Sequence, residues 1–135
     1  MKSYVYEIPG PPVSWSAHQG YGKRSFNPKF KQREYAQWIL REQNANRVIL
    51  SGALRVDLFF EMPVPKSLPK KITTKIHAGE KVWHTKRPDV DNLRKFINDC
   101  LTGTVWCDDS QITCGESQKY YAKDKPRTVI IVQEI

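Results

Sequence analysis

Apolar and polar residues alternate most clearly over residues 54–62. The apolar positions are Leu54, Val56, Leu58, Phe60 and Met62. Successive side chains of a strand point to opposite faces, so this spacing predicts a strand with one face on the core and the other wetter. Pro63 and Pro65 follow at once and should end it.

Three further segments carry strand patterns. Tyr4, Tyr6 and Ile8 alternate with polar or smaller residues before Pro9. Residues 127–134 are apolar on both faces, which predicts a strand in the middle of the sheet. Residues 112–121 precede them, and we expect the two segments to form a final hairpin joined across 123–126.

A helical period appears after residue 91. The apolar positions are Leu93, Phe96, Ile97, Cys100 and Leu101. This stripe predicts an amphipathic helix over 92–102, with Asp91 as the N-cap and Gly103 as the stop.

Two more helices are expected. Asn27 followed by Pro28 predicts a helix start, and the helix should run to about Asn44. The apolar stripe of this helix is assigned to Tyr35, Trp38, Ile39 and Glu42. A short helix should begin at a Ser67 cap and end near Gly79.

These elements predict an α+β fold. We expect one domain over residues 1–135, with a mixed sheet of about four to five strands packed against two main helices. Helices on one face would leave the other face, or an edge, for dimerisation. No leader and no run of about 18 apolar residues is visible, so we expect a soluble, unexported, cytoplasmic protein without membrane contact.

Charge changes this picture, because it is unevenly placed. The chain has a formal net charge of +8, yet residues 89–116 contain six acidic and two basic side chains, and the remainder contains 20 basic and eight acidic. A basic surface around an acidic island is the layout expected of a protein that binds a polyanion and cuts it.

Cys100, Cys107 and Cys114 match no zinc spacing and predict free thiols in a reducing compartment.

The acidic island suggests a metal site. Pro88 should keep the chain extended as it reaches Asp89, so that the side chains of Asp89 and Asp91 point the same way. Helical spacing then places Lys95 one turn from Asp91. The Asp108-Asp109 pair is a source for a third carboxylate, and such oxygen ligands suit a magnesium-like ion. In the alternative interpretation these residues are only a helix cap and a turn.

Basic residues near this stretch are candidates for DNA contact. Lys23 and Arg24 lie among aromatic residues and glycines in the 14–26 loop, and Lys86 and Arg87 end a lysine-rich segment that leads into Asp89. Such groups suit exposed bases and phosphates. They are equally compatible with an ordinary surface loop and a soluble connector.

Two segments of the chain resemble a known family. Residues 89–95 read DVDNLRK and residues 106–112 read WCDDSQI. In order and separation they are similar to the signature of the RusA-type Holliday junction resolvases. Agreement extends to residues 8–12, 62–67 and 84–88, so the resemblance covers most of the chain.

The resemblance implies a function and a set of residues. It implies a magnesium-dependent homodimeric endonuclease of recombination and repair that nicks four-way DNA junctions symmetrically. Asp89, Asp91 and Asp109 would bind the metal, and Lys95 would be the essential lysine. A nuclease of flaps or other branched DNA, and a non-catalytic DNA-binding module, remain the alternatives.

Overall fold

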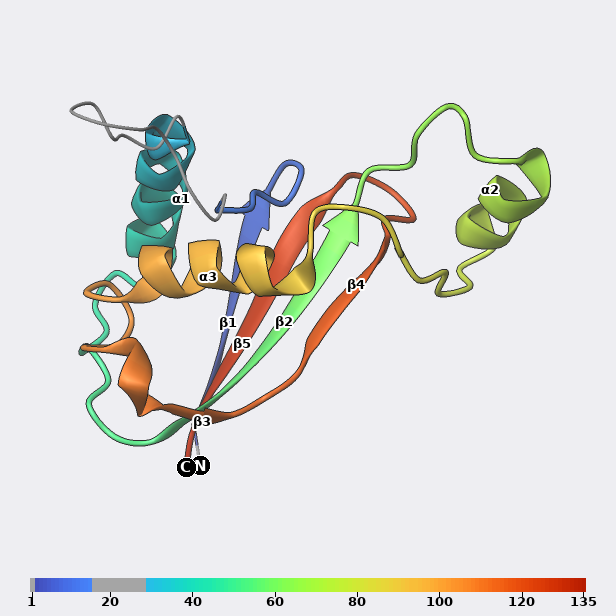
Figure 1. The fold of residues 1–135 in the computed structure, drawn as a ribbon. Helices are drawn as coiled ribbons and strands as arrows, with labels where there is room; N and C mark the ends of the chain where they lie inside the picture. The colour runs from blue at the N-terminus through green and yellow to red at the C-terminus, as the bar shows by residue number, and fades with distance from the viewer. Residues whose placement is uncertain (1, 16–28) are drawn as a thin grey trace.

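The computed structural model describes residues 2–15 and 29–135 (Figure 1). The elements are β1 (Ser3–Pro9), α1 (Phe30–Gln43), β2 (Leu54–Met62), α2 (Lys70–His77), α3 (Val90–Leu101), the 3-10 helix η1 (Asp109–Gln111), β3 (Ile112–Cys114), β4 (Ser117–Tyr121) and β5 (Arg127–Glu134). The five strands form one mixed sheet, and α1 and α3 lie on the same face of it, as Figure 1 shows. The predicted α+β class is confirmed.

The strand order places the last strand inside the sheet. β5 lies between β1 and β2 and is antiparallel to both, which confirms its predicted central position. β3 and β4 are both parallel to β2 on its other edge.

The predicted final hairpin is wrong, because β2 separates β4 from β5. The connection passes the end of β2, where Ala122 N donates to the carbonyl of Met62. Gly115 also splits residues 112–121 into two strands. Its φ is +135°, and a Cβ there would lie 1.9 Å from the carbonyl oxygen of Val56. Only glycine lets the chain approach β2 this closely.

The alternation predicted for β2 is confirmed. The five apolar side chains that alternate along β2 are all buried, and the residues between them are half-buried. They join residues of β1, β5, α1 and α3 in one core. The sheet therefore gives α3 a rigid apolar surface on which to lie.

The stripe predicted for α1 is wrong. Tyr35 is 51% exposed and Trp38 is 59% exposed, while Ala36 and Leu40 are buried. Asn44, directly after the helix, is also buried; its side chain accepts a hydrogen bond from the Tyr6 hydroxyl at 2.7 Å and donates to the main-chain carbonyl of Thr104. The helix ends as predicted, but the proposed start at 27–28 lies outside the described residues.

The short helix α2 begins later than predicted. It starts at Lys70 directly after Pro69, whose carbonyl accepts from the amides of Ile72 and Thr73, so Ser67 is not its cap. It ends before Gly79, which has a φ of +93°.

Within the described residues, none of these helices has both the length and the apolar character needed to cross a membrane.

Candidate functional site

The first carboxylates of the predicted site lie at the N-terminal end of α3. The helix begins at Val90, two residues earlier than predicted, so Asp89 rather than Asp91 is at the cap position. Its side chain makes no capping hydrogen bond, although its carbonyl accepts from the amide of Leu93 at 3.2 Å. Asp91 lies in the first turn, and both residues are exposed.

The expected extended geometry holds at Asp89, whose φ and ψ are −70° and 148°, but not at Val90 and Asp91. Val90 is already helical and packs partly against the core, so Asp89 is at the cap position and Asp91 is in the first turn. The Arg87-Pro88 peptide bond is cis. The carboxylates of Asp89 and Asp91 both lie at the positive pole of the helix dipole.

Lys95 lies on the same exposed side of α3. It is one helical turn beyond Asp91, and both side chains are exposed. Among the described residues, no hydrogen bond or ion pair of the Lys95 ammonium is found. Its charge is therefore available to an external anion.

The opposite side of α3 is fixed in the core, as predicted. Leu93, Cys100 and Leu101 are fully buried, and Phe96 and Ile97 are 2% exposed. Burial raises the pKa of the Cys100 thiol to about 12, so this cysteine is an inert core residue.

Arg94 ties α3 to the sheet. Its guanidinium donates to the hydroxyl of Ser117 on β4 and, at 3.0 Å, to the carbonyl of Val56 on β2. Burial lowers the pKa of Arg94, and the charge of Asp57 opposes this shift. The contacts cross the helix, β2 and β4, so they set the height of α3 over the sheet.

Lys119 of β4 was not identified from the sequence, although it reaches the same end of α3. Its ammonium donates to the carbonyl of Lys86 and, at 2.7 Å, to the carbonyl of Pro88. Burial lowers the pKa of Lys119, and the nearby charge of Asp89 raises it. Nothing in the residue pattern of β4 distinguishes this lysine from an ordinary strand lysine.

Asp109 lies in a separate structure, the turn after α3. Asp108 is the N-cap of η1, and its carboxylate accepts from the amide of Ser110 at 3.0 Å. Hydrogen bonding from the Ser110 side chain, and then from its amide, lowers the pKa of Asp108. Trp106 is fully buried just before the turn and donates from its indole to Thr102 at 2.9 Å. Asp109 itself remains exposed.

One amide side chain closes this turn. The Oε1 atom of Gln111 accepts from the amides of Cys107 and Asp108, both at 2.8 Å. Its Nε2 atom donates to the carbonyls of Leu50 and Gly52 at 3.0 and 2.9 Å. All the groups of the Gln111 amide are used, so the turn is joined firmly to the 50–52 loop.

The two carboxylate groups lie beyond opposite ends of one helix. Twelve helical residues correspond to a rise of about 18 Å, and in Figure 1 η1 lies past the C-terminal end of α3. Within residues 2–15 and 29–135, no three acidic, histidine or cysteine side chains are placed to hold one metal ion. Within a single chain, Asp89 and Asp91 thus lie at the start of α3, and Asp109 lies beyond its other end.

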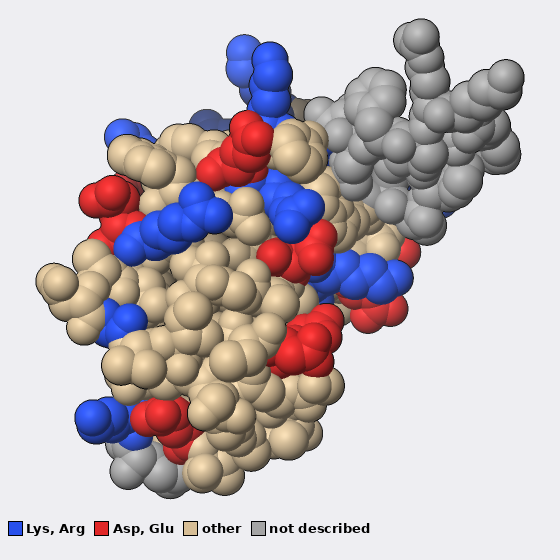
Figure 2. All heavy atoms as spheres, turned by 90° about the vertical axis from the view of Figure 1, so that its left-hand side faces the viewer, with Lys and Arg blue, Asp and Glu red and all other residues tan. Residues whose placement is uncertain are grey.

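The predicted DNA-binding residues are only partly described. Lys86 and Arg87 are exposed immediately before Asp89, whereas Lys23 and Arg24 lie outside the described residues. Figure 2 shows the side of the molecule that carries α1, where acidic and basic groups are interspersed and a broad area carries neither. That face therefore has no single basic patch among the described side chains.

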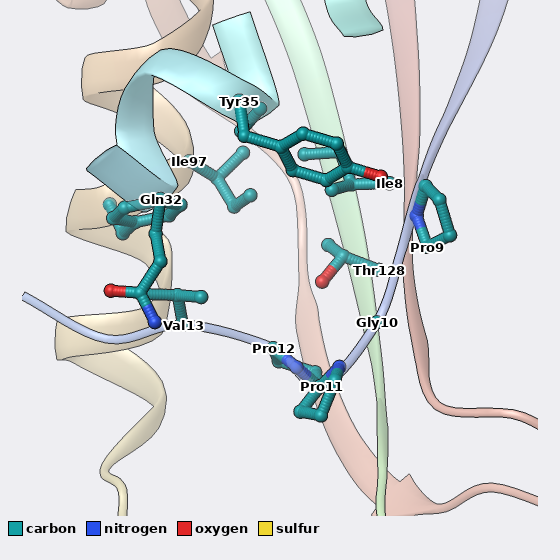
Figure 3. A pocket seen from close by; sticks show the side chains of 12 residues that line it. Ile8, Pro9, Gly10, Pro11, Pro12, Val13, Gln32, Tyr35, Ile97 and Thr128 are labelled. Atoms are coloured by element: carbon teal, nitrogen blue, oxygen red, sulfur yellow. The ribbon is translucent and has the colours of Figure 1, made fainter. Parts of the chain in front are cut away.

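An apolar cavity next to α3 has a different character from the carboxylate ends. It has a volume of about 200 Å³ and lies between α1, α3 and the end of β1. Figure 3 shows Tyr35 and Gln32 on one side and Pro9, Pro11 and Pro12 on the other. No acidic side chain lines it, so it offers no ligand for a cation.

A basic α+β domain that presents carboxylates at a helix end, with lysines beside them, is typical of a metal-dependent enzyme acting on nucleic acid. Comparison with known families assigns it more closely. Residues 9–133 match the family model described as Endodeoxyribonuclease RusA. The chain belongs to the RusA endodeoxyribonuclease family, whose members are Holliday junction resolvases and depend on metal ions.

A relative from Bacillus subtilis strain 168 is similar along its whole length. It is described as "Uncharacterized protein YqaN" and is 26% identical over 141 residues, covering 100% of this chain and 99% of the relative. The predicted family is confirmed by the family match.

Proposed function

We propose that this protein is a magnesium-dependent endonuclease that resolves four-way DNA junctions by paired symmetric nicks, in DNA recombination and repair. Asp89, Asp91 and Asp109 would hold the metal, with Lys95 next to the scissile phosphate. The donors fit a hard cation in their chemistry, because they are exposed carboxylates on a basic chain. A bound magnesium ion would supply an activated water and neutralise phosphate charge.

The observation that carries the proposal is the separation of the acidic groups along α3. Asp89 and Asp91 are at one end and Asp109 follows the other, although all three are exposed. We infer that Asp109 of one copy meets Asp89 and Asp91 of a second copy. A two-fold dimer then has two such composite sites, which is what two symmetric nicks require.

The protein residues have separate tasks in this site. Asp89 and Asp91 are fixed by the first turn of α3, and Asp109 by the η1 turn, so little reorganisation is needed when DNA binds. The Lys95 ammonium would stabilise negative charge on the phosphate or the leaving oxygen. Lys86 and Arg87 would contact the backbone of the DNA arm next to the cut.

The test is cleavage of four-way, flap and linear duplex DNA by the purified protein, with and without magnesium. We expect nicks of the four-way junction that require magnesium, and we expect Asp91→Asn to lower the rate by about 1,000-fold or more while junction binding is kept. Equal cutting of flaps would favour the branched-DNA nuclease, and binding without cutting would favour the non-catalytic module. If Asp91→Asn cut at the wild-type rate, the site assignment would be wrong.

A further inference from the structure

We propose that Lys119 is a second lysine of the nuclease site, a positioning residue that holds the turn before Asp89 and keeps a positive charge beside that carboxylate. The inference rests on the proposed function. It adds to the carboxylates and Lys95 a residue from β4, which lies outside both acidic segments.

The geometry of the Lys119 side chain carries this proposal. Its ammonium binds the carbonyls of Lys86 and Pro88, the residues on either side of Arg87 and directly before Asp89. An ammonium has three N–H donors. Two are used on these carbonyls, and the described residues contain no hydrogen-bond acceptor for the third. The third donor is therefore available to a phosphate oxygen or a water at the site.

The main chain around Lys119 holds the same segment. The amide of His84 donates to the carbonyl of Lys119, and the amide of Tyr121 donates to the carbonyl of Val82, both at 3.0 Å. Residues 82–84 thus run along the open edge of β4. The Lys119 side chain extends this attachment to the last residues before α3.

The charge of Lys119 has a neighbour next to α3. Asp89 is near enough to affect the Lys119 ammonium, and His84 is near enough to be affected by both Lys119 and Lys86. Two main-chain carbonyls and a carboxylate would otherwise gather negative charge where a phosphate must bind. A fixed ammonium offsets this charge, whereas Lys95, which has no such contacts, is free to follow the DNA.

Three substitutions separate the two roles of Lys119. Lys119→Met removes both the hydrogen bonds and the charge, Lys119→Gln keeps N–H donors without charge, and Lys119→Arg keeps both. Lys81→Gln is the matched control, because Lys81 lies at the same edge but binds the side chain of Gln118 at 2.7 Å. Each variant is assayed for single-turnover cleavage, junction affinity, thermal stability and hydrogen exchange of the Leu93 amide, which donates to Asp89.

We expect Lys119→Met to cut about 100-fold more slowly at saturating DNA, with a much smaller loss of junction affinity and faster Leu93 exchange. Lys119→Arg should restore most of the rate, Lys119→Gln should restore exchange protection but not the rate, and Lys81→Gln should match wild type. Wild-type cutting by Lys119→Gln, or a folded but slow Lys119→Arg, would overturn the proposal. If the wild-type protein cuts no branched DNA, the proposed function fails. The positioning role of Lys119 is tested separately, because unchanged exchange of the Leu93 amide in Lys119→Met would refute it.

Discussion

At its N-terminal end α3 presents Asp89 and Asp91, and the turn beyond its other end presents Asp109. The two regions are stabilised in opposite ways. The helix start is held by a cation from a distant strand, because Lys119 binds carbonyls 31 and 33 residues earlier in the chain. The η1 turn is held by the neutral amide of Gln111, which binds amides three and four residues earlier.

This difference shows what each carboxylate depends on. The position of Asp109 is mostly a local property of residues 107–111, joined to the 50–52 loop. The position of Asp89 depends on β4 and β2, through Lys119 and Arg94. Substitutions that loosen one region should therefore leave the other intact. Only a second copy of the chain should bring carboxylates of the two regions into one site.

The largest expected effect comes from mixing two inactive variants. Asp91→Asn and Asp109→Asn should each be inactive alone. In a mixed dimer, one site combines both substitutions and the other combines two wild-type halves, so one strand is nicked. With random exchange of subunits we expect about a quarter of the wild-type nicking, measured as nicked rather than fully resolved junctions.

The control for this mixture is Asp91→Asn with Asp89→Asn. Both substitutions lie at the same end of α3, so every dimer of this mixture has no intact site and should stay inactive. If the mixture of Asp91→Asn and Asp109→Asn also stayed inactive although subunits exchange, each chain would have to build its own site. The proposal that the two ends of α3 from different subunits form one site would then be wrong.

A smaller effect is expected from Gln111→Leu. The substitution removes four hydrogen bonds of the turn, and we expect a loss of about 1–3 kcal/mol in unfolding free energy together with a clear loss of cleavage. Gln111→Glu keeps the acceptors for the two amides but cannot donate to the carbonyls of Leu50 and Gly52. Urea unfolding and junction cleavage measure both effects.

The matched control for Gln111 is Gln118→Leu, which removes exposed side-chain bonds to Lys81 and Glu116. It should change the unfolding free energy by less than about 0.5 kcal/mol. If Gln111→Leu were equally harmless, the 107–111 turn would be held by Trp106 and its main chain rather than by the amide.

Arg94→Met should act on the other region and mainly on stability. The carbonyl of Val56 and the hydroxyl of Ser117 lose their donor, so the unfolding free energy should fall by about 1–2 kcal/mol, while cleavage changes less than in Gln111→Leu. Arg41→Met on the exposed side of α1 is the control and should be nearly neutral. Equal unfolding midpoints for the two variants would show that the Arg94 contacts do not support α3.

The contrast between the regions also explains what the sequence could predict. The α3 stripe, the alternation of β2 and the central β5 follow from apolar spacing, which depends on neighbouring residues. The hairpin failed because a contact between Gly115 and Val56, far apart in the chain, directs β4 to the edge of β2.

The candidate site shows the same limit. Asp89, Asp91 and Asp109 stand out as acidic residues on a basic chain, and the structure places each at a helix or turn start. The length of α3 between the acidic groups follows nearly from the predicted helix, but the contacts of Lys119 with the turn before Asp89 needed the tertiary structure. The role of Tyr35 and Trp38 was also misjudged, because helical spacing alone does not say which of two adjacent stripes faces the core.

The smallest expected effect separates the two adjacent aspartates of the turn. The Asp108 carboxylate caps η1, and the Asn side chain in Asp108→Asn still offers an oxygen to the Ser110 amide, so cleavage should stay within about threefold of wild type. Because hydrogen bonding from the Ser110 side chain and amide lowers the pKa of Asp108 below 3.8, the stability from its charged form is present above pH 3.8. It is lost as the pH falls through the folded-state pKa. Thermal unfolding at neutral and acidic pH should therefore show a small difference between wild type and Asp108→Asn only at the higher pH. Asp109→Asn, measured in the same assays, should abolish cleavage without this pH-dependent difference in stability. If Asp108→Asn and Asp109→Asn lost cleavage equally, Asp108 would be a metal ligand as well as the cap of η1.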